Sequence, residues 1–168
     1  AVSTRGGCHL RAYPIGNEIL RKPVPTDRFT FSGKARIVKI AEDANAIIDS
    51  LTACKFIFFG ATLEEYARAF TAVTGVESTG QDLSIIGERI YYAERIMNAK
   101  NGFNKIHDDL PQRFFKEPGS SGNNIEIQPI CRDDFLTARN NYYIVRGLDA
   151  NGLPTKEKSE ELGLTWND

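Results

Sequence analysis

The sequence predicts a mostly α-helical fold with an irregular segment at its N-terminal end. Apolar residues recur at three- and four-residue spacing over several long segments, which is typical of helices with one buried face. Capping signatures and closing glycines bound these segments, whereas glycine and proline are concentrated in residues 1–33. With 168 residues and no visible internal repeat, the chain is about the size of one domain, so we expect residues 1–168 to form a single helical domain.

The irregular segment is expected because residues 1–33 contain too many helix breakers for a long helix. These breakers are Gly6, Gly7, Pro14, Gly16, Pro23, Pro25 and Gly33. The chain also begins without an initiator methionine. We therefore interpret it as an excised or processed piece whose function could be divided with other parts of a protein.

The first helix is predicted to begin at Lys34 and to end near Cys54. Its inner face is expected to be the apolar stripe Ile37, Ile40, Ala41, Ala44, Ile47, Ile48 and Leu51. The dense apolar run at residues 56–59 is too short for a helix of its own. We expect this run to be buried, either as an extension of the first helix or as a tight connection.

A second helix is predicted from Leu63 to Val73, because Thr62 followed by Glu65 is a capping-box signature and Gly75 closes the apolar stripe. A third helix, predicted to be the longest, covers residues 79–101 and is closed by an Asn-Gly pair. Its inner face is expected to contain Leu83, Ile86, Ile90, Tyr91, Ala93, Glu94 and Met97.

Residues 102–131 are rich in Asn, Gly, Pro and Ser and predict an extended surface loop. A fourth helix is predicted for residues 132–148. Its inner face is expected to be Phe135, Leu136, Ala138, Tyr142 and Val145. A last short helix is predicted for residues 155–162, after Pro154 and before Gly163.

The overall composition excludes several classes of protein. Hydrophobic residues make up 41% and charged residues 26%, a globular balance that argues against disorder and against a membrane protein. The 21 Lys and Arg nearly cancel the 22 Asp and Glu, and no long basic run is present, so neither a nucleic acid nor a membrane surface is an expected partner. There is also no signal segment and no apolar run near the ~20 residues that a membrane span needs.

The three cysteines, Cys8, Cys54 and Cys131, are too widely spaced for a disulfide scaffold or a CxxC pair. A reducing compartment, the cytoplasm, is therefore expected. Cys54 has two interpretations: a buried cysteine that packs as a small hydrophobic residue, or a thiolate ligand of an iron–sulfur cluster. In the second case three further ligands must come from outside this chain, because Cys8 and Cys131 have no cluster spacing with Cys54.

His9 lies in a glycine-containing loop, where its imidazole could exchange protons near neutral pH. The alternative is a surface or hydrogen-bonded structural histidine. Arg5 and Arg11 bracket this segment and could hold an anionic ligand, or could simply be exposed arginines. His107 lies near carboxylates but lacks a second His or Cys at ligand spacing, so no metal site is expected there.

Four segments together resemble the aldehyde ferredoxin oxidoreductase family. They are STRGGCHLR at 3–11, LTACK at 51–55, DDLPQRFF at 108–115 and YYIVRGLDANGLP at 142–154. Their order and spacing are similar to the C-terminal third of that family, and the resemblance covers essentially the whole chain. It implies a multi-helical C-terminal domain of a larger three-domain enzyme.

The resemblance also implies an activity and its cofactors. Members of the family oxidise aldehydes to carboxylic acids, and the electrons pass through a tungsten bis-pterin centre and a 4Fe-4S cluster to ferredoxin. The first and middle domains, which supply the pterin cradle and three cluster cysteines, are expected partners that lie outside this chain. By the same resemblance, a relative that uses molybdenum or acts on another substrate is the runner-up.

Site residues follow from the resemblance position by position. Cys54 is similar to the fourth cluster ligand, and Asp49 to the acidic residue that accepts hydrogen bonds from one pterin. Ala53, at a position where relatives often carry Leu, is the remaining expected cofactor contact. His9 matches the position beside the metal and is expected to exchange a proton there. Because Asp49 and Cys54 are five residues apart, the helix must end or bend for both to face one ligand set.

For the fragment alone we expect no activity and no bound metal or pterin, since one thiolate and one imidazole cannot hold either group. A non-catalytic helical interaction module is the alternative from a different class. Where neighbouring domains are missing, apolar residues around 56–59 and in the opening segment are expected to be partly exposed, or covered by a second copy in a homodimer.

Overall fold

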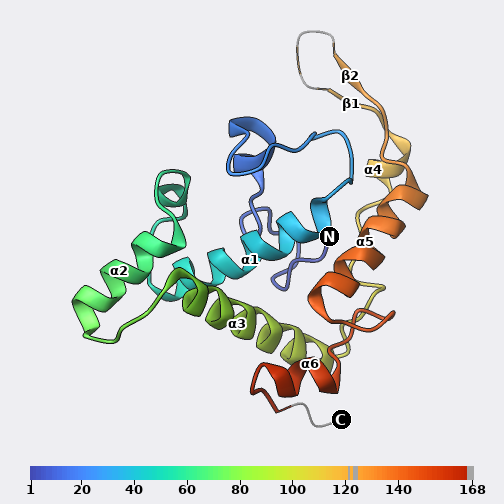
Figure 1. The fold of residues 1–168 in the computed structure, drawn as a ribbon. Coiled ribbons are helices and arrows are strands. Elements are labelled where there is room, and N and C mark those ends of the chain that lie inside the picture. Colours follow the sequence, from blue (N-terminus) through green and yellow to red (C-terminus); the bar gives the residue numbers. More distant parts are fainter. Residues whose placement is uncertain (121, 123–124, 166–168) are drawn as a thin grey trace.

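Helix α1 (Lys34–Ser50) lies at the centre of the fold and packs against α3 (Gly80–Lys100) and α5 (Arg132–Arg146) (Figure 1). The structure is a computed structural model that describes residues 1–120, 122 and 125–165. Helix α2 (Leu63–Thr74) packs on α3, and α6 (Lys156–Glu161) follows α5 in the chain. The mostly α-helical fold expected from the apolar spacing is confirmed.

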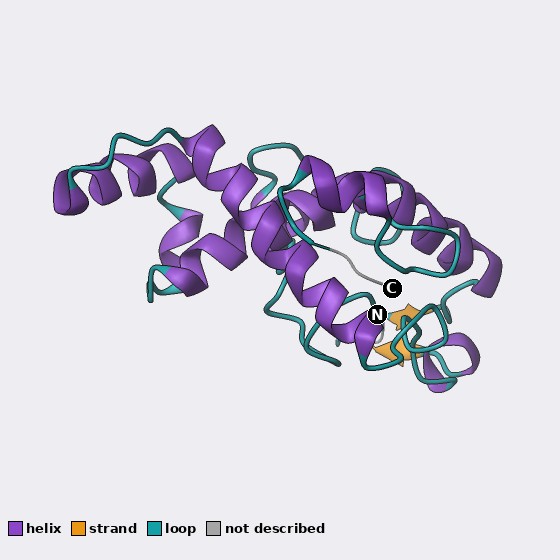
Figure 2. Ribbon diagram, turned by 90° about the horizontal axis from the view of Figure 1, so that it is seen from below, coloured by secondary structure: helices purple, strands orange, loops and turns teal. Residues whose placement is uncertain are grey.

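The remaining elements are short. They are the helical turns η1 (Gly16–Leu20), η2 (Lys55–Phe59) and α4 (Arg113–Lys116), and the strands β1 (Gly119–Ser120) and β2 (Glu126–Ile127). The strands pair antiparallel, with Gly119 opposite Ile127, and lie at the opposite end of the molecule from α2 (Figure 2). Residues 102–131 are thus mainly loop, as predicted, but they also contain α4 and this hairpin.

Capping residues define both ends of α2 and the start of α3 where the sequence predicted them. Thr62 and Glu65 form the expected capping box at the start of α2, and Gly75 ends that helix in the left-handed conformation with φ 74°. Thr79 and Asp82 form a second capping box at the start of α3. These ends are predictable because each depends on residues only three or four positions apart.

The close packing of α1 on α3 depends on Gly87. A Cβ atom at this position would lie 2.2 Å from the carbonyl oxygen of Asp43, so no larger residue fits unless the helices separate. Helical periodicity gave no indication of this contact, because a glycine adds nothing to an apolar stripe.

A buried polar network joins the three central helices around Arg146. Its guanidinium, which is fully buried, donates to Asp43 Oδ1 at 2.5 Å and to Glu42 Oε2 at 2.7 Å. The hydroxyls of Tyr91 and Tyr142 donate to the two oxygens of Glu42 at 2.8 and 2.7 Å. Burial raises the pKa of Glu42, although Arg146 and both tyrosines act in the opposite direction.

Several predictions of buried faces are wrong. Ile40 is 65% exposed, and Ile86 and Met97 are also exposed. On α1 the consecutive residues 42–48 are buried, because α3, α5 and the N-terminal segment surround that part of the helix. The predicted residues Ala44, Ile47 and Ile48 are among them, but the polar members of this stretch are buried too, with distant partners, so the apolar stripe identified only part of the buried face.

The segment after α1 also differs from the prediction. The first helix ends at Ser50 rather than near Cys54, and the apolar run forms the separate 3-10 turn η2. Phe56 is 59% and Ile57 54% exposed, so the expected burial of the run is wrong for this chain, whereas the exposure expected without neighbouring domains is observed. The side chain of Phe58 lies outside the described part. No helix among the described residues is long and apolar enough to cross a membrane.

Candidate functional site

A sharp turn separates Asp49, near the end of α1, from Cys54. The backbone N–H of Ala53 donates to Ile48 O at 3.0 Å and that of Thr52 to Asp49 O at 3.1 Å, which is the Schellman pattern of a helix C-terminus. Thr52 occupies the left-handed position of this turn with φ 54°. The helix therefore does end between Asp49 and Cys54, as their five-residue spacing requires if both face one ligand set.

Cys54 is exposed and is not in a disulfide. This exposure is contrary to the interpretation of Cys54 as a buried structural cysteine. The residue precedes η2 in an extended conformation, with φ −74° and ψ 126°. Its thiol is thus available to a partner outside this chain.

The carboxylate of Asp49 contacts three cationic side chains. Arg5 Nη1 and Arg11 Nη1 donate to Asp49 Oδ2 at 3.5 and 3.2 Å. Lys55 Nζ lies 2.7 Å from Asp49 Oδ1, an ion-pair distance, although it makes no hydrogen bond of good geometry. Asp49 remains 32% exposed, so the carboxylate can still accept hydrogen bonds from a ligand.

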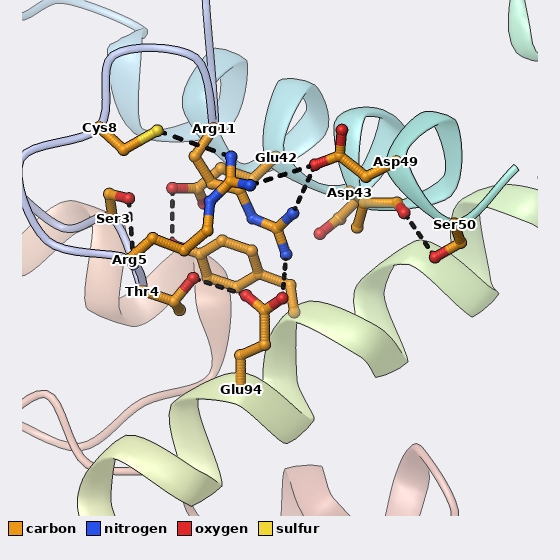
Figure 3. A network of polar contacts seen from close by, with 12 residues as sticks. Ser3, Thr4, Arg5, Cys8, Arg11, Glu42, Asp43, Asp49, Ser50 and Glu94 are labelled. Atoms are coloured by element: carbon orange, nitrogen blue, oxygen red, sulfur yellow. Dashed lines mark hydrogen bonds and ion pairs between the residues drawn. The ribbon is translucent and has the colours of Figure 1, made fainter. Parts of the chain in front are cut away.

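Arg11 lies between two carboxylates. Its Nη1 donates to Asp49 and its Nη2 donates to Glu94 Oε1 at 2.5 Å, as Figure 3 shows. The guanidinium carbon also lies 5.3 Å from the ring centroid of Tyr91. Arg11 is therefore a buried cation within the site rather than the exposed arginine of the alternative interpretation.

Helix α3 holds the irregular N-terminal segment against the site. The Tyr91 hydroxyl, whose single proton is shared between Glu42 and the backbone, lies 2.9 Å from Val2 O, and Asn98 Nδ2 donates to Thr4 O at 2.8 Å. The Thr4 hydroxyl in turn donates to Glu94 Oε2 at 2.5 Å. The segment that carries Arg5, Cys8 and His9 is thereby anchored without regular secondary structure of its own.

His9 is exposed, and its ring centroid lies 6.2 Å from that of Tyr13. Tyr13 also contacts Phe56 and Phe59, with ring centroids 6.0 and 5.7 Å away. The aromatic contacts bring the His9 loop beside η2, the turn that begins directly after Cys54. A chain of aromatic contacts thus leads from His9 through Tyr13 to the turn that follows Cys54.

Cys8 is the second thiol in this region. Burial alone would raise its pKa, but hydrogen bonds from the backbone N–H groups of Leu10 and Arg11 and the charge of Arg5 together lower the pKa of Cys8. Arg5 Nη2 lies 3.6 Å from Cys8 Sγ. Arg5 therefore interacts with both Cys8 and Asp49.

The structure thus brings together Asp49, Ala53 and Cys54 at one turn, with the His9 segment beside them. Sequence reasoning missed Lys55, Glu94 and Tyr13 as parts of this region. Lys55 is next to Cys54 and Tyr13 is four residues after His9, so proximity in the sequence could have indicated both, whereas Glu94 is far from every predicted site residue in the sequence.

The described residues contain no group of three or more His, Cys, Asp or Glu that could hold a metal ion. Cys54 can therefore supply one thiolate of a four-ligand cluster and no more from this chain. The donor chemistry fits such a partial role, since the thiol is exposed and unpaired. His107 instead accepts a hydrogen bond at Nδ1 from the backbone of Asn104 at 3.2 Å, a local structural contact.

Comparisons with known proteins identify the family. A family model described as "Aldehyde ferredoxin oxidoreductase, domains 2 & 3" matches residues 1–164. The tungsten-containing aldehyde ferredoxin oxidoreductases of Pyrococcus furiosus and Thermococcus kodakarensis are 38% and 36% identical to this chain over 166 residues. In both cases the match covers 98% of this chain and 27% of the relative.

Two further proteins are more distant. A protein of Pyrococcus furiosus named "Aliphatic sulfonate oxidoreductase, WOR-like subunit" is 31% identical over 129 residues, covering 73% of this chain and 20% of its own length. A solved structure of the active-site complex BamBC of benzoyl coenzyme A reductase with 1,5-dienoyl-CoA has a TM-score of 0.64 at 19% identity. That match covers 88% of this chain and 21% of the other and shows a shared fold. The chain belongs to the aldehyde ferredoxin oxidoreductase family.

Proposed function

We propose that this chain, as one helical domain, is the C-terminal part of an oxidoreductase that oxidises aldehydes to carboxylic acids. Electrons would pass through a tungsten bis-pterin centre and a 4Fe-4S cluster to ferredoxin. In the complete enzyme, the other domains of the same protein are joined to this chain. The observation that carries the proposal is the turn that follows α1, where an exposed Cys54 thiol lies five residues after the accessible carboxylate of Asp49.

Each proposed residue has a role that its surroundings allow. The Cys54 thiolate binds one iron of the cluster, and three cysteines of another domain complete the set. Asp49 accepts hydrogen bonds from a pterin, while Arg11 and Lys55 hold the carboxylate in place. Ala53 lines the turn between them. When bound, the tungsten and cluster groups supply acceptors for the two electrons of the reaction.

His9 is proposed to move a proton. Converting an aldehyde and water into a carboxylic acid releases two protons along with two electrons, so a nearby base is required. The exposed imidazole can accept a proton at one ring nitrogen. The packing of Tyr13 between His9 and η2 restricts the position of this ring.

Two alternatives remain. A related tungsten or molybdenum enzyme for another substrate is favoured by the likeness to the WOR-like subunit of an aliphatic sulfonate oxidoreductase. A non-catalytic helical module that binds a partner, a second copy in a homodimer included, is favoured by the exposed Phe56 and Ile57. Turnover by the complete enzyme with a panel of aldehydes and sulfonates separates these alternatives.

The isolated chain is proposed to be inactive. Its free thiols favour the cytoplasm as its compartment, because thiols are kept reduced there.

The decisive experiment compares two cysteine variants of the complete enzyme, purified without oxygen. Cys54→Ala should lose cluster iron, and electron delivery to ferredoxin should fall with it. Cys131→Ala is the matched control, because Cys131 is also exposed and free. Iron and tungsten are measured by mass spectrometry and the cluster by electron paramagnetic resonance. An intact four-iron cluster in Cys54→Ala would show that the ligand assignment is wrong.

A further inference from the structure

Helix α3 presents a polar stripe to the N-terminal segment. Tyr91, Glu94 and Asn98 are spaced three and four residues apart, so their side chains lie on one face of the helix. All three make hydrogen bonds to residues near the start of the chain. This stripe provides what the irregular segment lacks, namely fixed hydrogen-bond partners on a rigid element.

Glu94 differs from the other two because its two oxygens bind different parts of the site. Oε2 accepts from the Thr4 hydroxyl and Oε1 accepts from Arg11 Nη2, both at 2.5 Å. The Arg11 side chain is only 3% exposed, and its other Nη atom donates to Asp49. A nearly buried guanidinium requires such carboxylate partners, since burying it unpaired is strongly unfavourable.

The Arg11 guanidinium couples the position of the Asp49 carboxylate to that of Glu94. A guanidinium is planar and presents its N–H groups in a rigid fork, so fixing one Nη atom fixes the direction of the other. Arg5 holds Asp49 less firmly, because it is 43% exposed and 3.5 Å away. Lys55 Nζ lies nearer, 2.7 Å from Asp49 Oδ1, but it makes no hydrogen bond of good geometry and carries a point charge on a flexible stem, so it attracts the carboxylate without fixing its direction.

We infer that Glu94 is a positioning residue of the cofactor site, which orients the Asp49 carboxylate through Arg11 while it anchors the His9 segment through Thr4. The inference rests on the proposed function, in which Asp49 accepts hydrogen bonds from a pterin. Glu94 itself touches neither cofactor nor substrate. Glu94 lies on α3, 45 residues after Asp49 on α1 in the sequence.

The test measures how fast tungsten leaves the complete enzyme during anaerobic dialysis against a chelator, in four variants. Glu94→Gln keeps the shape of the side chain and removes its charge, and should release tungsten about tenfold faster than the unsubstituted enzyme. Asp49→Asn should show a similar or larger increase. In the double variant, Glu94→Gln should add little to Asp49→Asn, because the two residues act through one pathway.

The matched control is Glu88→Gln, on the same helix. Glu88 also has two cationic partners, Lys39 and Lys158, at 3.1 and 3.2 Å, but has no contact with Arg11 or Asp49. Its variant should lose a comparable amount of thermal stability while the tungsten release rate is unchanged. A general loss of helix stability therefore cannot imitate the expected result.

Three outcomes would overturn the inference. An unchanged release rate in Glu94→Gln, with Asp49→Asn still accelerated, rejects the positioning role and leaves the proposed function intact. Fully additive effects in the double variant show that Glu94 acts independently of Asp49. An unchanged release rate in Asp49→Asn rejects the inference together with the proposed pterin contact of Asp49.

Discussion

The ring centroids of His9 and Tyr13 lie 6.2 Å apart, with the ring planes tilted by 53°. Tyr13 also packs edge-on against Phe56 at 6.0 Å. The loop that carries the proposed proton-transfer residue is thus supported by an aromatic side chain that contacts the turn after Cys54. This relationship makes the role of His9 testable apart from that of the cluster ligand.

Replacing His9 by Ala in the complete enzyme should lower kcat by about 10²–10⁴-fold, the usual contribution of a positioned acid or base. Tungsten and iron contents should be unchanged, because the proposed cluster ligand is Cys54 and the proposed pterin contact is Asp49. His107→Ala, which removes the second exposed histidine, serves as the control and should keep normal turnover. Full turnover of His9→Ala with an aldehyde would show that His9 is not the proton-transfer residue and has only a structural role.

Replacing Thr52 by Gly should stabilise the 168-residue chain by about 0.5–1 kcal/mol. A β-branched residue at φ 54° is strained by about 1–2 kcal/mol, and the greater freedom of glycine in the unfolded chain offsets only part of that gain. Urea unfolding measures the change. Ser50→Gly, at the last residue of α1, should instead destabilise the chain by about 0.5 kcal/mol. A loss of stability in Thr52→Gly would contradict the strain argument.

Replacing Arg146 by Met should destabilise the chain by about 3–5 kcal/mol, since it leaves the buried carboxylates of Glu42 and Asp43 without their common partner. The control is Arg68→Met, because Arg68 is exposed and lies 4.0 Å from Glu64, so its loss should change stability by less than about 1 kcal/mol. Chemical unfolding near pH 7 compares the two variants. Equal effects would show that the central network does not hold α1 and α5 together.

Alkylation of Cys8 should follow a pH profile shifted to lower pH than that of the unfolded chain. The folded structure lowers the pKa of Cys8, so its reactive thiolate persists at a lower pH. Arg5→Ala should move the profile back toward higher pH, because it removes the cation 3.6 Å from the sulfur. Iodoacetamide rates in a Cys54→Ser, Cys131→Ser background give the profile, with Arg21→Ala as the control. A profile that Arg5→Ala leaves unmoved would exclude Arg5 as a cause.

Much of the helical architecture was predictable from the sequence because its signals are local. The ends of α2 and α3 follow from Thr62, Gly75 and Thr79, whose partners lie within one helical turn. The end of α1 was misplaced because a threonine, rather than a glycine, occupies its left-handed position. Sequence rules for helix ends rely on glycine, which usually adopts this conformation, so they do not predict a helix end at Thr52.

The sequence by itself determined the helical class, the family resemblance and the candidate residues His9, Asp49, Ala53 and Cys54. Only the tertiary structure decided which side chains surround them. The contact between Arg11 and Glu94 joins residues 83 positions apart, and that between Arg146 and Asp43 joins residues 103 apart. Periodicity and capping report interactions within a few residues, whereas these buried ion pairs exist only because α1, α3 and α5 pack closely enough to exclude water.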